Sequence, residues 1–506
     1  MTLHTFWKPL LLYIASAIAL PTLAQTSRLG EQLKYTLQAE GTVGKGRYAP
    51  LWFTSNRYGL GTVEPNGGLL RTAIGRDVAA DSLRHWRVGY GADLAGVFEY
   101  ESRFVVQQLY TDIQYKRWQL SIGQKERPLE LKNQELSSGA MTTGINARPL
   151  PQARLEVPEF WTVPRTNGWL ALRGHLAYGL YTDHRWQRQF TEGTKNLHSA
   201  HSLYHSKAGF LRIGNTEKFP LTLTGGIEMS AQFGGEVWNL VNRADHKGTI
   251  ASNQKMNSGL KGMWQAFIPG GSDANDGDFA NVAGNQLGSW HLRADYAQHG
   301  WKAALYAEHF FEDHSQLGFA YDWKDMLYGL EVQFPHNPVV HTFLYEHLRT
   351  THQSGPIYHD ATPTLPVSIA GVDEYYNHHV YSAWQHAGRV MGHPLLLSPI
   401  YNTDGAIRIR HNRVTANHFG LSGQPLREVG YRLLYTHQRS LGTYPQPLTR
   451  PAYGNYLLIE VTYTPHWLPG LTVAAAYGQN RGTLLGHSRG GLLTLTYSGW
   501  INPKKP

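Results

Sequence analysis

The chain has 506 residues, a formal net charge of +9, 16% charged and 12% aromatic residues, 53 glycines and no cysteine. So few charges with so many aromatics exclude a disordered chain, and the absence of apolar runs near ~20 residues beyond the N-terminus excludes a bundle of membrane helices. Without cysteine there is no disulfide framework, cysteine-ligated metal, cysteine nucleophile or lipid anchor on cysteine. The positive charge favours acidic partners: nucleic acid, phosphorylated lipid or acidic polysaccharide.

The first 24 residues have the pattern of a secretory signal peptide. Lys8 gives a short basic region, residues 10–20 are apolar, and the small residues Thr22 and Ala24 precede a cleavage site before Gln25. The apolar run is too short for a stable membrane span. We therefore predict an exported chain, with residues 25–506 forming one domain, and we expect no nucleic acid partner.

Runs of alternating apolar and polar residues follow along the chain. They include residues 108–115, 290–296, 301–308, 457–464, 471–477 and 493–497. Strict alternation predicts strands with two different faces. Several runs approach the ten residues that a tilted strand needs to cross a bilayer, with Tyr or Trp near their ends.

This pattern predicts an all-β fold: a transmembrane antiparallel β-barrel of about 16–18 strands, an even number as in bacterial barrels. A soluble β-sandwich also alternates and remains the alternative. The barrel prediction places the chain in the outer membrane.

The connections can be assigned by their lengths, with short turns on the periplasmic side and long loops outside. Residues 234–288 and 351–404 are predicted as long outer loops, and 298–300, 335–338 and 465–470 as inner turns. The last strands are expected near 405–418, 429–440, 455–464, 471–479 and 490–501, with an outer loop at 441–453. Upstream of about 184 the alternation fails. The hairpin at 116–117 and the long segment 128–168 fall on the wrong sides, so one strand there is missed or added.

A further group of motifs carries a family resemblance. The segment Asp-Glu-Tyr-Tyr-Asn-His-His-Val-Tyr at 373–381, with Trp384 and Gly-Arg-Val-Met-Gly-His-Pro-Leu at 388–395, resembles the capsule-assembly Wzi family in its Bacteroidetes form. Residues 166–170, 284–290, 412–419, 431–436 and 442–444 agree with it. The resemblance implies an outer-membrane barrel with long, partly helical loops plugging the lumen. It also implies a lectin that tethers capsular polysaccharide.

The 351–404 loop and the strand after it supply side chains suited to sugars, which are bound by carboxylates, amides, arginines and flat aromatic faces. The candidate glycan-binding residues are Asp373, Glu374, Tyr375, Tyr376, Asn377, Trp384, Arg389, Arg408 and Arg410. The arginines could pair bidentately with uronates. The alternative is that Tyr376, Trp384 and Arg389 only pack the loop into the lumen.

The 234–288 loop is a second source of binding groups. It contains Trp238, Asn239, Arg243, Lys247, Lys255 and Lys261. Its charges could instead face only water or the phosphates of lipopolysaccharide.

Apparent catalytic and metal motifs do not hold. Residues 486–490 match G-x-S-x-G, but a strand is expected after Ser488 and no acid or histidine follows it. Glu374, His378, His379, His386 and His393 lack a zinc-protease spacing, and Asp273, Asn275, Asp276 and Asp278 do not fit a calcium loop. We therefore predict no enzyme, no metal and no cofactor.

The sequence predicts a monomeric outer-membrane lectin-like barrel. Its partners would be capsular or other surface polysaccharide and the lipid or lipopolysaccharide of the outer membrane. Its function would be in capsule assembly or attachment. Two alternatives remain: a passive diffusion channel, with an open and conducting lumen, and an outer-membrane hydrolase.

Overall fold

The computed structural model describes residues 29–81, 84–241, 250–251, 253–268, 284–312, 323–357, 359, 362–367 and 371–503. The predicted signal peptide lies outside the described residues and stays a prediction.

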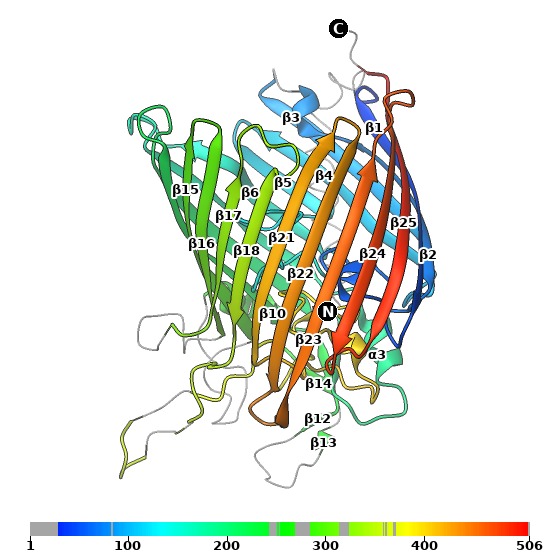
Figure 1. Cartoon of the computed structure of the whole chain (residues 1–506). Helices are drawn as coiled ribbons and strands as arrows, with labels where there is room; N and C mark the ends of the chain where they lie inside the picture. Colours follow the sequence, from blue (N-terminus) through cyan, green and yellow to red (C-terminus); the bar gives the residue numbers. More distant parts are fainter. Residues whose placement is uncertain are drawn as a thin grey trace.

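One closed antiparallel sheet of 18 strands forms the body of the molecule (Figure 1). Each strand pairs with its neighbours in chain order, and the first pairs with the last, with Leu33 opposite Ile501 and Lys45 opposite Arg489. The barrel prediction is thus confirmed at the upper end of its range. The strands are β1(Leu33–Lys45), β2(Gly67–Arg76), β3(Trp86–Phe98), β4(Phe104–Tyr115), β5(Trp118–Gln124), β6(Pro151–Thr162), β7(Leu170–Leu180), β9(Leu203–Ile213), β10(Leu221–Phe233), β15(Asn285–Gln298), β16(Trp301–Glu312), β17(Met326–Gln333), β18(Thr342–Arg349), β21(Val414–Leu426), β22(Val429–Gly442), β23(Pro447–Tyr463), β24(Leu471–Gly482) and β25(Ser488–Ile501).

The remaining elements are short and lie in the connections. They are α2(Leu51–Thr54), α3(His184–Phe190), α4(Leu260–Phe267), the 3₁₀ turns η2(Val78–Asp81) and η4(Pro399–Tyr401), and the strands β8(His198–Ala200), β11(Glu236–Trp238), β12(Leu240–Val241), β13(Ile250–Ala251), β14(Gln254–Lys255), β19(Gln385–His386) and β20(Arg389–Val390). No helix in the described part of the chain is long and apolar enough to cross a membrane.

The two ends of the barrel differ in the length of their connections. At one end, here the short-turn end, strands are joined by turns such as 116–117, 299–300 and 427–428, and β1 begins and β25 ends there. At the other end, the loop end, the connections include 125–150, 234–284 and 350–413. The connections predicted as long, 234–288 and 351–404, and the hairpin at 116–117 lie at opposite ends, but the loop end also has short connections such as 443–446 and 483–487.

Three strand predictions need correction. The segment predicted as one long connection, 128–168, contains β6, the missed strand. Pro158 lies where the pairing of β6 with β7 shifts, between Val157 and Trp161, so its missing N–H disturbs no regular ladder. The predicted strand 405–418 is β21, which starts only at Val414, and the predicted outer loop 441–453 is mostly strand, with only 443–446 between β22 and β23.

Alternate residues of the wall face opposite sides. On β4, Leu109 is 59% exposed, whereas Asp112 and Gln114, of the opposite parity, are buried. On β16, Leu305 is 62% exposed and Glu308 is fully buried. The outward face is thus apolar and the inward face polar, the arrangement of a barrel that spans a membrane. Exposed aromatic rings near the short-turn end include Trp86, Trp118, Phe219, Trp301, Trp467 and Trp500.

Candidate functional site

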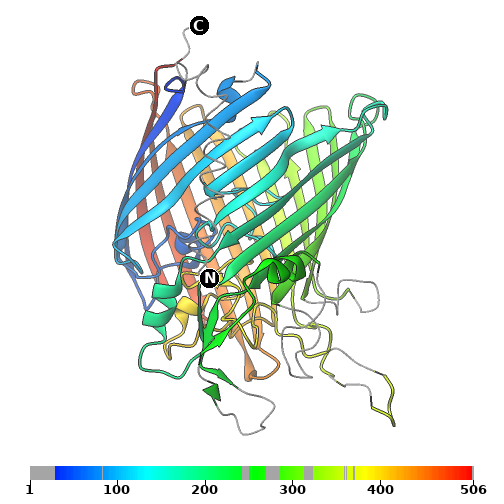
Figure 2. The same ribbon diagram turned by 180° about the vertical axis from the view of Figure 1, so that it is seen from behind.

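Three connections at the loop end fold back between the walls of the barrel. They are 46–66, 125–150 and 371–413, which Figures 1 and 2 show as ribbons within the lower half of the barrel. Their residues share one hydrophobic cluster with inward-facing strand residues. Its members include Trp52, Leu136, Met141, Trp384 and Leu396 from the connections and Phe310, Leu344 and Leu434 from the wall. The main core of this protein therefore lies inside the barrel.

Buried carboxylates of the wall hold the 125–150 segment. Lys132 forms an ion pair with Glu308, and both side chains are 1% exposed. The other carboxylate oxygen of Glu308 accepts the backbone N–H of Met141 at 2.8 Å. Glu346 accepts the Ser138 N–H and the Ser137 hydroxyl, each at 2.7 Å. Because a buried charge is tolerated only when paired and hydrogen-bonded, these contacts fix the position of the segment.

Four of the predicted glycan-binding residues are fully enclosed. Tyr375, Tyr376 and Trp384 are 0% exposed and Arg389 is 3% exposed. The Trp384 indole N–H donates to the carbonyl of Thr142 at 2.9 Å. The Tyr376 hydroxyl donates to the carbonyl of Met141 and accepts the His393 N–H at 3.0 Å, and both tyrosine rings meet Phe310 edge to face. Their rings are used by interior packing.

Arg389 joins three parts of the loop end. Its guanidinium pairs at 3.0 Å with Glu101, which lies in the connection between β3 and β4. It also donates to the carbonyls of Gly61 and Thr54 in the 46–66 segment. Glu101 also pairs with Arg148 at 3.3 Å, so two guanidiniums share one carboxylate. Burial lowers the pKa of Arg148 most. Glu101 raises it and the neighbouring Arg389 lowers it again, so the pKa lies below its ordinary value.

The other predicted residues lie where the 371–413 segment reaches the surface. Glu374 binds the Arg408 guanidinium through both oxygens and accepts the Asn377 amide at 2.9 Å. Arg410 pairs with Asp404. The side chains of Arg408 and Arg410 are 40% and 42% exposed. We call Glu374, Asp404, Arg408 and Arg410 the rim cluster. Asp373, the remaining predicted residue, is half-buried beside it.

The Asn377 side chain fixes this arrangement. Its carbonyl accepts the Ile409 N–H at 2.8 Å and its amide donates to the Ile409 carbonyl at 2.8 Å. Ile409 itself is fully buried. Ile407 and Ile409 are buried, whereas Arg408 and Arg410 between and after them are partly exposed, so this segment has one face in the interior core and the other at the surface.

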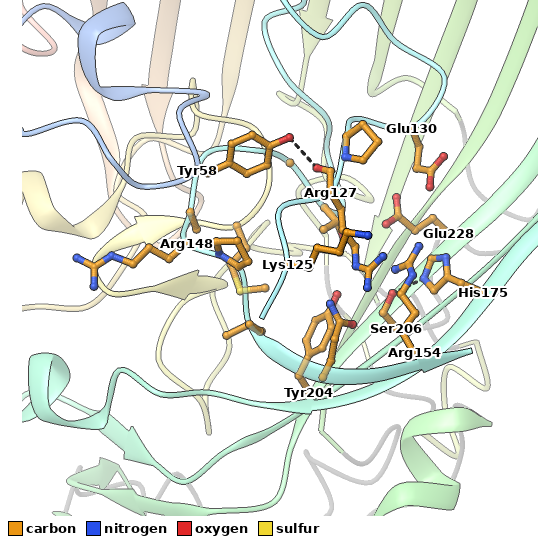
Figure 3. A pocket seen from close by; sticks show the side chains of 18 residues that line it. Tyr58, Lys125, Arg127, Glu130, Arg148, Arg154, His175, Tyr204, Ser206 and Glu228 are labelled. Atoms are coloured by element: carbon orange, nitrogen blue, oxygen red, sulfur yellow. Dashed lines mark hydrogen bonds between the residues drawn. The ribbon is translucent and has the colours of Figure 1, made fainter. Parts of the chain in front are cut away.

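A small polar cavity lies inside the barrel between the 125–150 segment and β6, β7, β9 and β10 (Figure 3). Its volume is about 80 Å³. Pockets for small molecules usually measure about 300–1,000 Å³, so this one has room for a few waters rather than a sugar ring. Its lining includes Lys125, Arg127, Glu130, Arg154, His175 and Glu228. Arg127 and Arg154 both pair with Glu156, at 3.1 and 2.7 Å.

The rejected motifs can be located in part. Ser488 is buried at the start of β25, so the strand expected after it is confirmed. His386 contacts Thr182 and the Arg148 carbonyl, whereas His393 contacts Ser138. Within the described ranges no group of three or more His, Cys, Asp or Glu could hold a metal ion. The calcium-like residues 273–278 lie outside the described residues, as do Arg243 and Lys247.

Sequence reasoning missed the 46–66 and 125–150 segments as parts of the interior. A signal existed for the second: residues 133–147 are mostly small, uncharged and turn-forming, and they follow Lys132. Glu308 and Glu346 were a second signal, because each lies on the polar face of a strand and needs a buried partner. Neither signal alone identifies which segment meets which strand.

No protein-family model matches the chain, and no curated protein matches it in sequence. Among solved structures, it is similar to Wzi of Escherichia coli, described as an outer-membrane protein involved in group 1 capsule assembly and a carbohydrate-binding β-barrel. The TM-score is 0.54 at 12% identity, over 94% of this chain and 86% of that one. OccK5 of Pseudomonas aeruginosa gives 0.47 at 9%, over 93% and 98%, and OprD of the same species 0.45 at 9%, over 94% and 96%. The closed sheet and the similarity to Wzi give the fold of an outer-membrane barrel.

Proposed function

We propose that the protein is an outer-membrane barrel of the Wzi type that binds the cell's own surface polysaccharide and contributes to capsule attachment. The observation that carries the proposal is the rim cluster, which presents two partly exposed arginines beside loop segments that pack against the inner wall. Loop segments packed inside this end of the barrel support a binding surface better than an open passage. The similarity in fold to a carbohydrate-binding barrel agrees with it.

The binding chemistry would be that of an acidic glycan. A guanidinium has five N–H donors, and the contacts of Arg408 with Glu374 use only two of them. The exposed donors of Arg408 and Arg410 could bind a uronate carboxylate bidentately. The acidic partners Glu374 and Asp404 hold the two guanidiniums in place and could accept sugar hydroxyls. Tyr375, Tyr376, Trp384 and Arg389 would support this surface from beneath.

The test is a comparison of two polymers with the detergent-purified barrel. We expect selective binding to surface polysaccharide from the protein's own strain over a charge-matched unrelated polyanion. The double variant Arg408→Gln/Arg410→Gln should weaken that binding about tenfold or more, as expected when charge-assisted hydrogen bonds worth about 1.5–3 kcal/mol each are lost.

The matched control is Arg450→Gln, which removes an exposed arginine of β23 and should leave binding unchanged. Equal binding of both polymers, or of neither, would sink the lectin proposal. If the rim variant and the control variant lose binding equally, the binding is nonspecific attraction of the polymer by positive charge. Variants of Trp384 or Arg389 are unsuitable here, because their burial means that lost binding could reflect lost packing.

A passive diffusion channel is the second candidate, and the charged inner wall of the barrel favours it. Conductance in a planar bilayer tests this directly. Steady single-channel steps with the wild-type chain, together with no selective polysaccharide binding, would support the channel.

A further inference from the structure

Helix α4 lies on the outside of the barrel, unlike the interior segments (Figure 2). It belongs to the long connection between β10 and β15 and contacts β9 and β10. Its inner face is formed by Gly262, Gln265 and Ala266, which are buried. Ala266 shares a hydrophobic cluster with Ala231 and Phe233, against which Tyr178 and Met263 pack.

The wall residues beneath α4 face outward. Ala231 and Phe233 have the same parity on β10 as Leu223, which is 50% exposed. Tyr178 has the parity of Leu172 and Leu176 on β7, which are 42% and 36% exposed. Residues of the opposite parity, such as His175 and Glu228, line the internal cavity. The helix therefore covers the membrane-facing side of the wall, not its lumenal side.

Three outward side chains donate to carbonyls of the helix, and two of these carbonyls are among the last four, which a helix leaves without an internal partner. The Tyr178 hydroxyl of β7 donates to the Met263 carbonyl at 3.0 Å, and the Gln286 amide of β15 donates to the Gln265 carbonyl at 3.0 Å. The Lys207 ammonium of β9 donates to the Phe267 carbonyl and lies 4.8 Å from the centre of the Phe267 ring. The helix is thus attached across four neighbouring strands.

The outer face of the attached helix is apolar. Leu260, Trp264 and Ile268, four residues apart, are 78%, 61% and 48% exposed. Leu260 and Trp264 lie on one side of the helix, because residues i and i+4 share a face, and Ile268 follows directly after the last helical residue. On the side of α4 toward the short-turn end, the outer wall has an apolar hollow lined by Leu211, Leu223, Leu292 and Leu305, among others. The apolar row is therefore continuous with the membrane-facing surface.

The depth of the helix matches the edge of that surface. From Leu221 at the short-turn end of β10 to Ala231 beneath the helix, the strand advances ten residues. A tilted strand needs about 9–11 residues to cross the hydrocarbon core. The helix therefore sits where the apolar layer ends and the headgroups begin, the location in which amphipathic helices lie in the plane of a membrane.

We propose that α4 is an interfacial helix whose Leu260–Trp264–Ile268 row inserts into the outer leaflet of the membrane. Its occupant is lipid: acyl chains against the apolar row and headgroups above it. The helix widens the membrane-contacting surface of the barrel over β7, β9, β10 and β15. It thereby fixes how deeply this side of the barrel sits in the membrane and how the barrel is tilted there.

The absence of cysteine allows a direct test with single-cysteine variants carrying an environment-sensitive NBD dye. The test position is Trp264→Cys, the lipid reference Leu223→Cys and the water reference Leu365→Cys, an exposed apolar residue of the 350–413 connection. Each full-length variant is placed in phosphatidylcholine vesicles with bromines at defined acyl depths. We expect the dye at 264 to emit as at 223 and to be quenched most by bromines near the headgroups, at a depth of about 5–10 Å.

A water-like signal at 264 with a lipid-like signal at 223 would overturn the proposal for α4 alone. Water-like signals at both positions would overturn it together with the membrane placement of this wall. The variant Leu260→Asp/Ile268→Asp, combined with the dye at 264, is a second test. Charges on an exposed face should leave the barrel folded and shift the dye toward water, and an unchanged signal would contradict insertion.

Discussion

The two longest connections of the loop end use their aromatic and apolar residues in opposite directions. The 371–413 part of one connection folds into the barrel, and Trp384 is 0% exposed within it. In the 234–284 connection, helix α4 lies against the outer wall, and Trp264 is 61% exposed on it. Both tryptophans lie in long connections of the loop end. What differs is the surface each segment meets, a polar inner wall or an apolar outer wall, so the same residue type serves as core in one and as membrane contact in the other.

The inner wall explains how a polar surface can hold a hydrophobic core. Glu308, Glu346 and Glu312 accept backbone N–H groups of the interior segments, including those of Met141, Ser138 and Tyr376. The wall therefore supplies acceptors for the irregular backbone that the core brings with it. Once these groups are satisfied, the apolar side chains of the segments can pack on each other.

The largest expected effect comes from exchanging the two tryptophans one at a time for alanine. Trp384→Ala removes a fully buried ring and the hydrogen bond to Thr142, and should lower the free energy of opening of the 371–413 segment by about 3–5 kcal/mol. Trp264→Ala should change barrel stability in detergent by no more than about 0.5 kcal/mol, as for exposed residues. Hydrogen exchange measures the local openings, and urea unfolding measures the whole barrel. Similar effects of both variants would contradict the comparison.

A smaller effect is expected from acid, and it should be confined to the interior. Burial, followed by the nearby Lys132 ammonium, lowers the pKa of His393 to about 3. An unfolded histidine titrates near ~6.5, so between these values the opened segment binds a proton that the folded one does not. Stability of the 371–413 segment should therefore fall as the pH falls from about 6.5 toward 3.

The variant His393→Gln should flatten that pH dependence while keeping a donor for Ser138, which lies 3.1 Å from the His393 Nε2. The control His336→Gln replaces an exposed histidine in a short turn and should leave the slope unchanged. Hydrogen exchange of the 371–413 segment at two pH values measures both slopes. An unaltered slope in the His393 variant would show that other groups carry the acid sensitivity.

Much of the wall could be predicted from the sequence, because period-2 alternation records which face of a strand meets water or lipid. It failed at β6, where Pro158 interrupts the pattern, and at 405–413, where alternating Ile and Arg mimic a strand. In that segment Ile407 and Ile409 face the interior core instead of lipid. A local pattern tells that one face is buried, but not what buries it.

The candidate site was less predictable for the same reason. The motif at 373–395 was correctly identified as a dense group of aromatic and polar residues, yet Trp384 and Arg389 are enclosed and Arg408 and Arg410 are exposed. The difference depends on partners far away in sequence, such as Thr142 for Trp384 and Glu101 for Arg389. No single-sequence pattern encodes such pairings.

The most local effect is expected at the attachment of α4. Lys207→Met removes the donor to the Phe267 carbonyl but keeps an apolar stem against the ring, so the helix should loosen by about 1 kcal/mol, the net value of one partly exposed hydrogen bond. The measurement is hydrogen exchange of residues 260–268 in vesicles and in detergent. If lipid holds the apolar row of α4, the loss should be smaller in vesicles than in detergent, because the membrane replaces part of the lost attachment. Equal losses would mean that the wall alone holds the helix. The outer connection would then be held by protein contacts only, like the inner one.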